Sequence, residues 1–555
     1  MAGGILDLVA TGSQDIILIG NPEKTFFKAK YSKYTNFGMQ KFRIDYNGLR
    51  TLRLDEESEF KFKVPKYADL LMDTYVVVNL PIIWSALYPP QTSYEEWRGY
   101  EFKWIRDLGC QMIKEIEIST GGQLIQKYSG SYIQNMVNRD YSKTKKDLFN
   151  EMTGNVPELY APDTVNDRQF NYPHAYYSKN ANGSCPSIEG RKLFIPINTW
   201  FTQSSKMAFP ISALYNNDLF ITVRFRSIRE LFTIRDITDI TNDYPRVAPN
   251  FTDPLMQFYR FLQTPPTEKV ADSDYDDKRI LWNADVHLYA TYCFLSEDEG
   301  RLFKSQDQQY LIKLIYEHEF NNVVGSKKLT LNTSGLVSNW MFTFERSDVN
   351  LRNQWSNYTN WPYDFIPLNI IPAPTSGGSY KYKDYFSSLF PDGLPPGVNP
   401  NGAKTNFYIQ DSYSIKNEKN ILNQFGIVFD GNYRENLMDV GIYRFIEPFY
   451  KSNGPTTDGL YFYNFSLHSD PKEIQPSGAT NLTMINKIEL ECTTLTPTLD
   501  EDATVMTVCD ENGTIIGINK PSWIIYDYTY TMRLYEEKYN TLTFQSGNCG
   551  LTYAR

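Results

Sequence analysis

Apolar and polar residues alternate with a period of two along much of the chain. In residues 59–65, Phe60 and Phe62 fall on one face of an extended backbone, whereas Lys61 and Lys63 fall on the other. Such alternation indicates antiparallel strands with one buried and one polar side. The same pattern recurs in residues 218–226, 285–295, 339–346, 484–492 and 523–535. The chain is therefore predicted to be all-β.

Two local signals add a hairpin and a helix to this pattern. In residues 114–128, Gly121 and Gly122 separate two strand-like runs and supply the positive φ angles of a tight turn, which predicts a β-hairpin. Ser296 followed by Glu299 is a capping-box motif, which predicts a short helix. Because strands precede and follow this helix, we expect it to connect two β domains.

Loop-like segments rich in Pro, Gly, Asn and Asp occupy residues 233–280 and 353–410. Loops of this length in a compact domain are functional surfaces or mobile segments, and a jelly roll can carry them without change to its barrel. Residues 466–491 are interpreted as a joint between strands at 461–467 and 484–492. We expect His468 in this joint to be solvent-facing or hydrogen-bonded, with a pH-sensitive contact as the alternative.

Composition narrows the classes of protein. A length of 555 residues suits two large β domains. The net charge of −10 argues against a protein that coats nucleic acid with its whole surface. Residues 75–84, the longest apolar run, are interrupted by Asn79 and Pro81, so no membrane span is predicted. The six cysteines contain no C-x-x-C pair, which favours reduced thiols over a disulfide framework.

No motif of enzyme chemistry emerges, and we predict neither catalytic residues, nor a metal, nor a cofactor. The glycine motifs of nucleotide binding and the nucleophile elbow are absent. His318-Glu319 lacks the second histidine of a zinc-protease helix. Residues 272–278 resemble half of a calcium loop, but Asp277 replaces its glycine and Asn283 its glutamate, so a solvated acidic loop is favoured.

Blocks of sequence spread along the whole chain carry a family resemblance. Residues 209–225, 288–312 and 539–555 are three of them, although Asn217-Asp218 stands where the family has His-Glu. The signature residues of the other two blocks are Gly20, Asn21, Pro22, Phe26, Phe27 and Asn36, and then Gln475, Pro476, Ser477, Gly478 and Asn481. Together the blocks resemble the major capsid proteins of nucleocytoplasmic large DNA viruses. The N-terminus and loop lengths are most similar to the mimivirus-like branch.

This resemblance implies two tandem eight-stranded antiparallel jelly-roll barrels with long loop insertions. It places an N-terminal arm at residues 1–25, the first barrel at 26–296, a connector helix at 297–307 and the second barrel at 308–555. It further implies a homotrimeric, pseudo-hexagonal capsomer in the icosahedral capsid of a large double-stranded DNA virus. Its implied partners are neighbouring capsomers, minor capsid proteins and the inner membrane, with no specific nucleic-acid sequence. Synthesis and assembly are expected in a viral factory of the host cytoplasm.

The N-terminal region has two features that suggest contacts. The arm is rich in Ile, Leu and Val, so we expect it to seek a partner and to be disordered when free. Residues 24–66 carry eleven Lys and Arg against five acids. A contact with an anionic inner surface would use Lys28, Lys30, Lys33, Lys41 and Arg43. Solvated strand faces and intersubunit ion pairs are the favoured interpretation, because strand alternation already explains several lysines.

Two other functions remain open on the residues alone. A jelly-roll protein that binds or cleaves carbohydrate would line an exposed groove with the many aromatic residues. A nucleic-acid coat would bind DNA through residues 24–66 in a salt-dependent way. The mass in solution separates the first alternative from the capsomer, because only the capsomer is expected at three times the mass of the chain.

Overall fold

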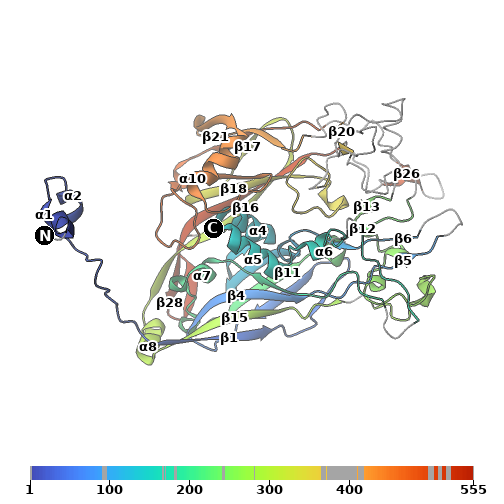
Figure 1. Ribbon diagram of the computed structural model, residues 1–555, viewed down its shortest axis with the longest axis horizontal. Helices are drawn as coiled ribbons and strands as arrows, with labels where there is room; N and C mark the ends of the chain where they lie inside the picture. Colours follow the sequence, from blue (N-terminus) through green and yellow to red (C-terminus); the bar gives the residue numbers. More distant parts are fainter. Residues whose placement is uncertain are drawn as a thin grey trace.

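Two β-sandwiches lie side by side in the computed structural model, and the N-terminal segment extends away from them (Figure 1). The structure describes all residues except 1–2, 91–96, 166–167, 169–170, 180–183, 240–243, 280–281, 364–369, 372–408, 411–417, 498–505, 510–514, 520–526 and 554–555. Most of the predicted 353–410 insertion and the start of the 523–535 run therefore lie outside the described residues.

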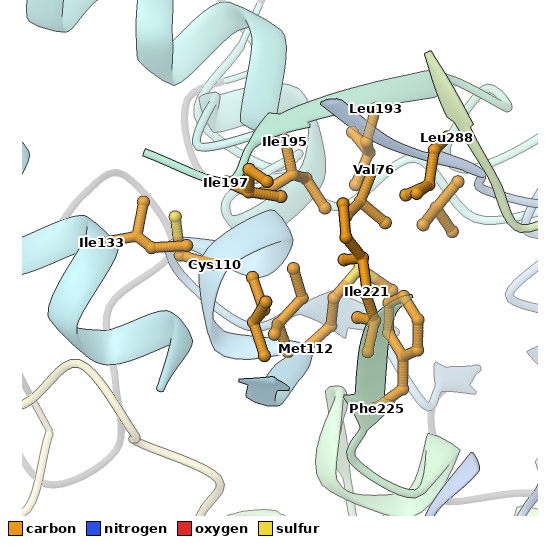
Figure 2. Packing of buried hydrophobic residues seen from close by; sticks show 14 of the residues in the cluster. Val76, Cys110, Met112, Ile133, Leu193, Ile195, Ile197, Ile221, Phe225 and Leu288 are labelled. Atoms are coloured by element: carbon orange, nitrogen blue, oxygen red, sulfur yellow. The ribbon is translucent and has the colours of Figure 1, made fainter. Parts of the chain in front are cut away.

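The first sandwich is built from two four-stranded antiparallel sheets. One sheet has the order β1 (Phe37–Asp45), β15 (His287–Leu295), β4 (Leu70–Asn79) and β10 (Lys192–Pro196). The other has the order β3 (Ser58–Lys63), β11 (Leu219–Phe225), β8 (Ile113–Thr120) and β9 (Gln123–Tyr128). Figure 2 shows their facing side chains, with Val76, Leu193 and Leu288 on one side and Ile221 and Phe225 on the other.

The second sandwich repeats this strand order. One sheet contains β16 (Gln308–Val323), β28 (Tyr530–Gln545), β18 (Leu336–Arg346) and β23 (Leu460–Asn464), and the other contains β17 (Ser326–Thr330), β25 (Ile488–Thr494), β21 (Leu422–Phe429) and β22 (Asn432–Asp439). In both sandwiches the strands numbered one, eight, three and six along the chain form one sheet, and two, seven, four and five form the other. This is the jelly-roll order, so the prediction of two tandem eight-stranded jelly rolls is confirmed.

Helices and short strands occupy the connections. The helices are α1 (Gly3–Val9), α2 (Ile16–Ile19), α3 (Leu108–Gln111), α4 (Gly130–Asp140), α5 (Lys143–Thr153), α6 (Pro157–Tyr160), α7 (Trp200–Gln203), α8 (Glu297–Ser305), α10 (Glu447–Lys451) and the π-helix η9 (Ile442–Ile446). The 3₁₀ turns are η1 (Ser205–Met207), η2 (Ile211–Ala213), η3 (Ile228–Glu230), η4 (Pro254–Met256), η5 (Phe258–Phe261), η6 (Asp272–Asp274), η7 (Val349–Leu351) and η10 (Leu482–Met484). The short strands are β2 (Thr51–Leu52), β5 (Leu87–Tyr88), β6 (Arg98–Gly99), β7 (Lys103–Trp104), β12 (Phe232–Arg235), β13 (Arg246–Val247), β14 (Trp282–Asn283), β19 (Ile370–Ile371), β20 (Ile409–Gln410), β24 (Thr480–Asn481), β26 (Met506–Cys509), β27 (Ile515–Asn519) and β29 (Asn548–Leu551).

Strand alternation predicts burial well where one sheet face meets solvent. In β3, Phe60 and Phe62 are buried while the flanking lysines are exposed. The hairpin of β8 and β9 turns through Gly121 and Gly122, whose φ angles are 55° and 82°. The prediction is wrong for β18, which is buried on both faces. Phe342 packs into the core of the second sandwich, whereas Met341 packs against the first sandwich.

Several local expectations need correction. Ser296 occupies the N-cap of α8, but its side chain makes no capping hydrogen bond. The strand expected at 461–467 is β23 and ends at Asn464, and the strand expected from Met484 is β25 and begins at Ile488. Residues 482–484, just before β25, form η10 instead. Asn481 caps this turn by accepting a hydrogen bond from the Thr483 amide at 3.1 Å. The arm was expected to be disordered, yet it forms α1 and α2.

Candidate functional site

A cluster of buried polar and charged side chains joins the two sandwiches. Arg139 on α4 donates from Nε to both carboxylate oxygens of Asp140 at 3.0 Å, and from Nη2 to Glu537 Oε1 on β28 at 2.6 Å. Asn339 on β18 accepts from Arg139 Nη1 at 2.8 Å and donates to Glu537 Oε2 at 2.9 Å. The hydroxyl of Ser469 donates to Asp140 Oδ1 at 2.6 Å. These five residues are called the junction cluster below.

The charges of the junction cluster depend on one another. The side chains of Arg139, Asp140 and Glu537 are 1%, 0% and 5% exposed. Burial alone would lower the pKa of Arg139, but the two carboxylates outweigh it and hold this pKa above its ordinary value. Burial would raise the pKa of Glu537, yet Arg139 reverses the effect. Burial does raise the pKa of Asp140. Removing one member of such a network leaves a buried charge unpaired, so the cluster holds the sandwiches in one orientation.

Backbone contacts reinforce the junction. The Gly454 N–H donates to the Arg139 carbonyl at 2.7 Å, and a Cβ at position 454 would lie only 2.4 Å from the Asn138 carbonyl oxygen. Glycine alone allows this approach. Along the neighbouring strand edges, Gln126 of β9 donates to the Ile315 carbonyl of β16 at 3.1 Å and accepts from the Ile315 amide at 3.2 Å. The edge of one sandwich is therefore bonded to the other.

The second group of signature residues shapes the loop that carries Ser469. The Ser477 hydroxyl accepts from the His468 N–H at 3.4 Å and donates to the His468 carbonyl at 3.1 Å. Gly478 has a φ of 135°, a conformation that side chains rarely adopt. Asn481 caps the η10 turn that follows. Of the remaining signature residues, Gln475 is exposed and Pro476 is half-buried. This loop connects two strands and places Ser469 beside Asp140 of the junction cluster.

The first group of signature residues and the basic candidates lie together on the N-terminal segment and β1. The exposed residues among them are Gly20, Asn21, Pro22, Phe26, Phe27, Asn36, Lys28, Lys30, Lys33, Lys41 and Arg43. Arg43 pairs with Asp45 at 2.7 Å and with Asp285 at 2.8 Å. Within the described part of the chain, Lys28, Lys30 and Lys33 form no ion pair. The basic candidates are thus divided between Arg43, which pairs within the chain, and four lysines that face solvent, since Lys41 is exposed as well.

Two of the exposed apolar surfaces in the described part of the chain lie on the arm and on the second sandwich. On the arm, Leu8 is 78% exposed and Leu18 is 88% exposed, and the arm stands clear of the sandwiches (Figure 1). On the second sandwich, Phe449 and Tyr450 of α10 are 79% and 76% exposed, next to the exposed Phe445 of η9. Clusters of exposed large apolar side chains mark interaction sites in soluble proteins. The sequence analysis anticipated the arm but missed the surface formed by η9 and α10.

The structure brings together no catalytic constellation among the four histidines. His318 Nε2 lies 3.1 Å from Glu536 Oε2, and His468 Nδ1 lies 2.9 Å from Glu473 Oε2, while His174 and His287 are largely buried with pKa values lowered by that burial. In the part of the chain that the structure describes, no group of three His, Cys, Asp or Glu side chains is placed to hold a metal. None of the described helices is long and apolar enough to cross a bilayer.

The acidic loop at residues 272–278 is held by internal partners. Asp272 pairs with Arg260 at 3.3 Å and with Lys278 at 2.8 Å. These partners lower the pKa of Asp272, chiefly through the hydrogen bond from Lys278. Asp277 pairs with the neighbouring Arg279. The carboxylates therefore neutralise nearby cations of the same chain.

Sequence reasoning did not find the junction cluster, although two signals point to it. Arg139 and Asp140 are adjacent opposite charges in a helix whose residues are all buried. In β28, Glu536, Glu537 and Lys538 interrupt an alternating run with three consecutive charges, and all three are buried. Because Glu and Lys side chains are ordinarily exposed, it is the structure that shows these three to be buried against partners.

Comparisons with known proteins agree with this architecture. The major capsid protein of Phaeocystis pouchetii virus is 24% identical over 590 aligned residues, which cover 100% of both chains. Probable capsid protein 4 of Acanthamoeba polyphaga mimivirus is 26% identical over 403 residues, covering 61% of this chain and 72% of the relative. Relatives from mimivirus are thus among the matches, as the N-terminal resemblance suggested.

Solved structures show the same fold. The quasi-atomic model of the PBCV-1 virus capsid has a TM-score of 0.59 at 17% identity, covering 96% of this chain and 100% of that chain. The Faustovirus major capsid protein has a TM-score of 0.59 at 12% identity, covering 96% of this chain and 94% of that chain.

Family models settle the relationship. Residues 25–295 match the N-terminal region of the major capsid protein. Residues 299–550 match the major capsid protein of large eukaryotic DNA viruses. Because the two matches together take in almost the whole chain in the expected order, this protein belongs to the major capsid proteins of large eukaryotic DNA viruses.

Proposed function

We propose that the chain forms a homotrimeric, pseudo-hexagonal capsomer that tiles the icosahedral shell of a large double-stranded DNA virus. Membership of the family makes the chain a structural virion protein and not an enzyme, and proteins of this kind assemble into capsomers. One observation supports the trimer in particular. The two sandwiches share one strand order, so their edges correspond. In the described part of one chain, one edge of the first sandwich contacts one edge of the second, and the corresponding edges on the outer sides are left without a partner sandwich.

The joined pair is formed by β9 of the first sandwich and β16 of the second. Besides the contacts of Gln126, Ser129 at the end of β9 donates from its amide to Glu317 Oε1 of β16 at 2.7 Å, and α4 follows directly. In the second sandwich, β22 takes the place of β9, and η9 with α10 takes the place of α4. In the first sandwich, β1 takes the place of β16. Both β22 and β1 are sheet edges with mostly exposed residues.

The unjoined edges have the surface that an interface requires. Phe449 and Tyr450 are exposed beside β22. On β1 and its neighbour β15, Phe37, Met39 and Phe294 are 50%, 59% and 38% exposed. Placing β22 and α10 of one copy on β1 of the next repeats the internal junction between chains. A head-to-tail contact of this kind closes after three copies into a ring of six similar walls, and it covers both exposed edges.

The remaining parts of the proposal concern organisation and location. The arm at residues 1–25 precedes the first jelly roll at 26–296, the connector at 297–307 and the second jelly roll at 308–555. Beneath the shell, the arm and the solvent-facing Lys28, Lys30 and Lys33 contact minor capsid proteins and the anionic inner membrane. Signature residues at both ends of the chain support assembly. Assembly takes place in viral factories of the host cytoplasm, without recognition of a specific nucleic-acid sequence.

Light scattering coupled to gel filtration tests the trimer. The purified full chain is expected at about three times 64.4 kDa. The double variant Phe449→Glu with Tyr450→Glu places charges in the proposed interface and is expected to run as a monomer with unchanged circular dichroism. Tyr176→Glu, at a side chain that is 58% exposed elsewhere on the first domain, is the matched control and should remain trimeric. A monomeric wild-type chain, or a double variant that stays trimeric, would refute the proposed interface.

A further inference from the structure

A polar cavity of about 440 Å³ lies between the two sandwiches, next to the junction cluster. Its first wall is formed by α4, α5 and α6, and its second wall by residues 356–359 and 456–458. Helices α4, α5 and α6 are drawn near one another in the central part of the view in Figure 1. The volume falls within the range of about 300–1,000 Å³ typical of small-molecule sites. Neither the shell function nor the trimer interface uses this cavity.

Four buried polar atoms of residues that line the cavity have no hydrogen-bond partner among the residues that the structure describes. Gln134 Oε1 and Asn138 Oδ1 come from one face of α4, since the residues are four positions apart. Ser356 Oγ and Thr457 Oγ1 belong to the opposite wall. Gln134 and Asn138 are only 4% and 6% exposed. An unpartnered buried amide oxygen destabilises a fold, so two of them beside one cavity point to an external donor.

The charged groups of the cavity balance one another. Asp107 accepts from the Asn155 amide at 2.6 Å, and Asp458 forms ion pairs with Lys419 and Arg444. Two basic residues, Arg106 and Lys146, also line the cavity. Burial lowers the pKa of Lys146, and the nearby Asp107 carboxylate opposes that shift. The lining thus contains two acids and two bases, a balance in number that suits a neutral ligand.

Aromatic rings complete the lining. Tyr160 lies under the Arg106 guanidinium, with 4.7 Å between the guanidinium carbon and the ring centroid. Tyr358 is buried on the opposite wall, where its hydroxyl accepts from Asn135 at 3.4 Å. The lining thus combines amide oxygens that accept, hydroxyls that donate or accept, and ring faces. A sugar ring offers the complementary groups, because its hydroxyls donate and accept while its C–H faces pack on aromatic rings.

We propose that this cavity binds a neutral polyhydroxylated ligand of the pyranose class. Hydroxyls of the sugar donate to Gln134 Oε1 and Asn138 Oδ1 on one wall and bond Ser356 and Thr457 on the other. A bound sugar therefore bridges the two jelly rolls beside the junction cluster. Inorganic phosphate is the charged comparison, because Arg106 and Lys146 line the same space as Asp107 and Asp458.

Ligand-detected NMR and thermal unfolding of the full chain test this proposal. The probes are the methyl glycosides of glucose, galactose, mannose and N-acetylglucosamine at millimolar concentration, with inorganic phosphate as the charged comparison. At least one glycoside is expected to give saturation transfer and to raise the Tm, whereas phosphate should do neither. A free sugar and the terminal residue of a glycan offer the same hydroxyls. Binding to immobilised oligosaccharides that end in the same sugars would identify a glycan terminus as the ligand, whereas binding to the methyl glycosides alone would identify a free sugar.

Shape-conserving variants separate a binding role from a structural one. Gln134→Met with Asn138→Leu removes both unpartnered oxygens, so the Tm without sugar is expected to stay the same or rise, while binding weakens at least tenfold. Thr457→Val tests the other wall independently and should also weaken binding. Asn332→Ala, at an exposed position outside the cavity, is the control and should bind like the wild type. Absence of binding by every glycoside, binding that survives both variants, or an unliganded Tm that falls by several degrees would overturn the proposal.

Discussion

Replacing Arg139 by leucine is expected to open the junction between the two jelly rolls. The substitution leaves Asp140 and Glu537 without their guanidinium, in a site where their side chains are 0% and 5% exposed. Breaking a buried ion pair in this way costs about 3–5 kcal/mol, because the stranded charge has no water around it. Two carboxylates lose their partner here, so we expect the upper part of this range at neutral pH.

The cost of this substitution should depend on pH in a predictable direction. In the native chain, Arg139 holds the pKa of Glu537 below its ordinary value, so this carboxylate stabilises the fold above its unfolded pKa, and that contribution disappears as the pH falls. In the variant, burial is opposed by the Lys313 charge and the Asn339 hydrogen bond but no longer by Arg139, so the pKa of Glu537 rises and protonation on acidification relieves the unpaired charge. The difference in stability between variant and wild type should therefore be smaller at pH 5 than at pH 8.

Hydrogen exchange of the α4 amides, followed by mass spectrometry, measures this opening locally. A loss of about 3–5 kcal/mol corresponds to exchange faster by about 10² to 5 × 10³ times. Arg279→Leu is the matched control, because the Arg279 side chain is 84% exposed in its pair with Asp277 and such a surface pair contributes at most about 1 kcal/mol. Equal exchange of α4 in both variants, or a cost that grows on acidification, would refute the argument for the junction cluster.

Three further predictions address the backbone, the pH response and the basic segment. Gly454→Ala should lower the Tm, at a cost of about 1–3 kcal/mol, because its Cβ meets the Asn138 carbonyl oxygen at 2.4 Å; Gly300→Ala, whose Cβ meets only the Asp69 side chain at 3.5 Å, is the neutral control. Asp348 is paired with Arg346 and Arg352, which hold its pKa at about 2 against the opposing effect of burial. Because this pKa is depressed, Asp348→Asn should cost about 2 kcal/mol at pH 7 and progressively less as the wild type is titrated from about pH 4 to pH 2 in urea unfolding; a constant cost would contradict the pairing. Changing Lys28, Lys30 and Lys33 to Gln should weaken sedimentation with anionic vesicles by about 1 kcal/mol per lysine without affecting the trimer, whereas unchanged sedimentation would remove the membrane contact from the proposal.

Most of the architecture could be predicted from local pattern. Strand alternation depends only on neighbouring residues, so segments such as β3 and β11 were located with their buried faces correct. Turn chemistry is equally local, as the glycine pair between β8 and β9 shows. The strand ends at Asn464 and Ile488 were missed, because they depend on which neighbour a backbone pairs with and on the competing cap from Asn481.

The sequence by itself determined that the chain is made of antiparallel strands, since the period-two pattern is a property of contiguous residues. The two tandem jelly rolls followed from the resemblance of its sequence blocks to a known family. Tertiary structure alone decided how the rolls meet. Arg139 and Glu537 are 398 positions apart, and no local rule pairs them. It also decided that β18 is buried on both faces, that α10 presents aromatic side chains to solvent, and that Gln134 and Asn138 face a polar cavity. The physical reason is that buried charges and amides are positioned by whichever distant groups satisfy them, and those groups come together only after the chain has folded.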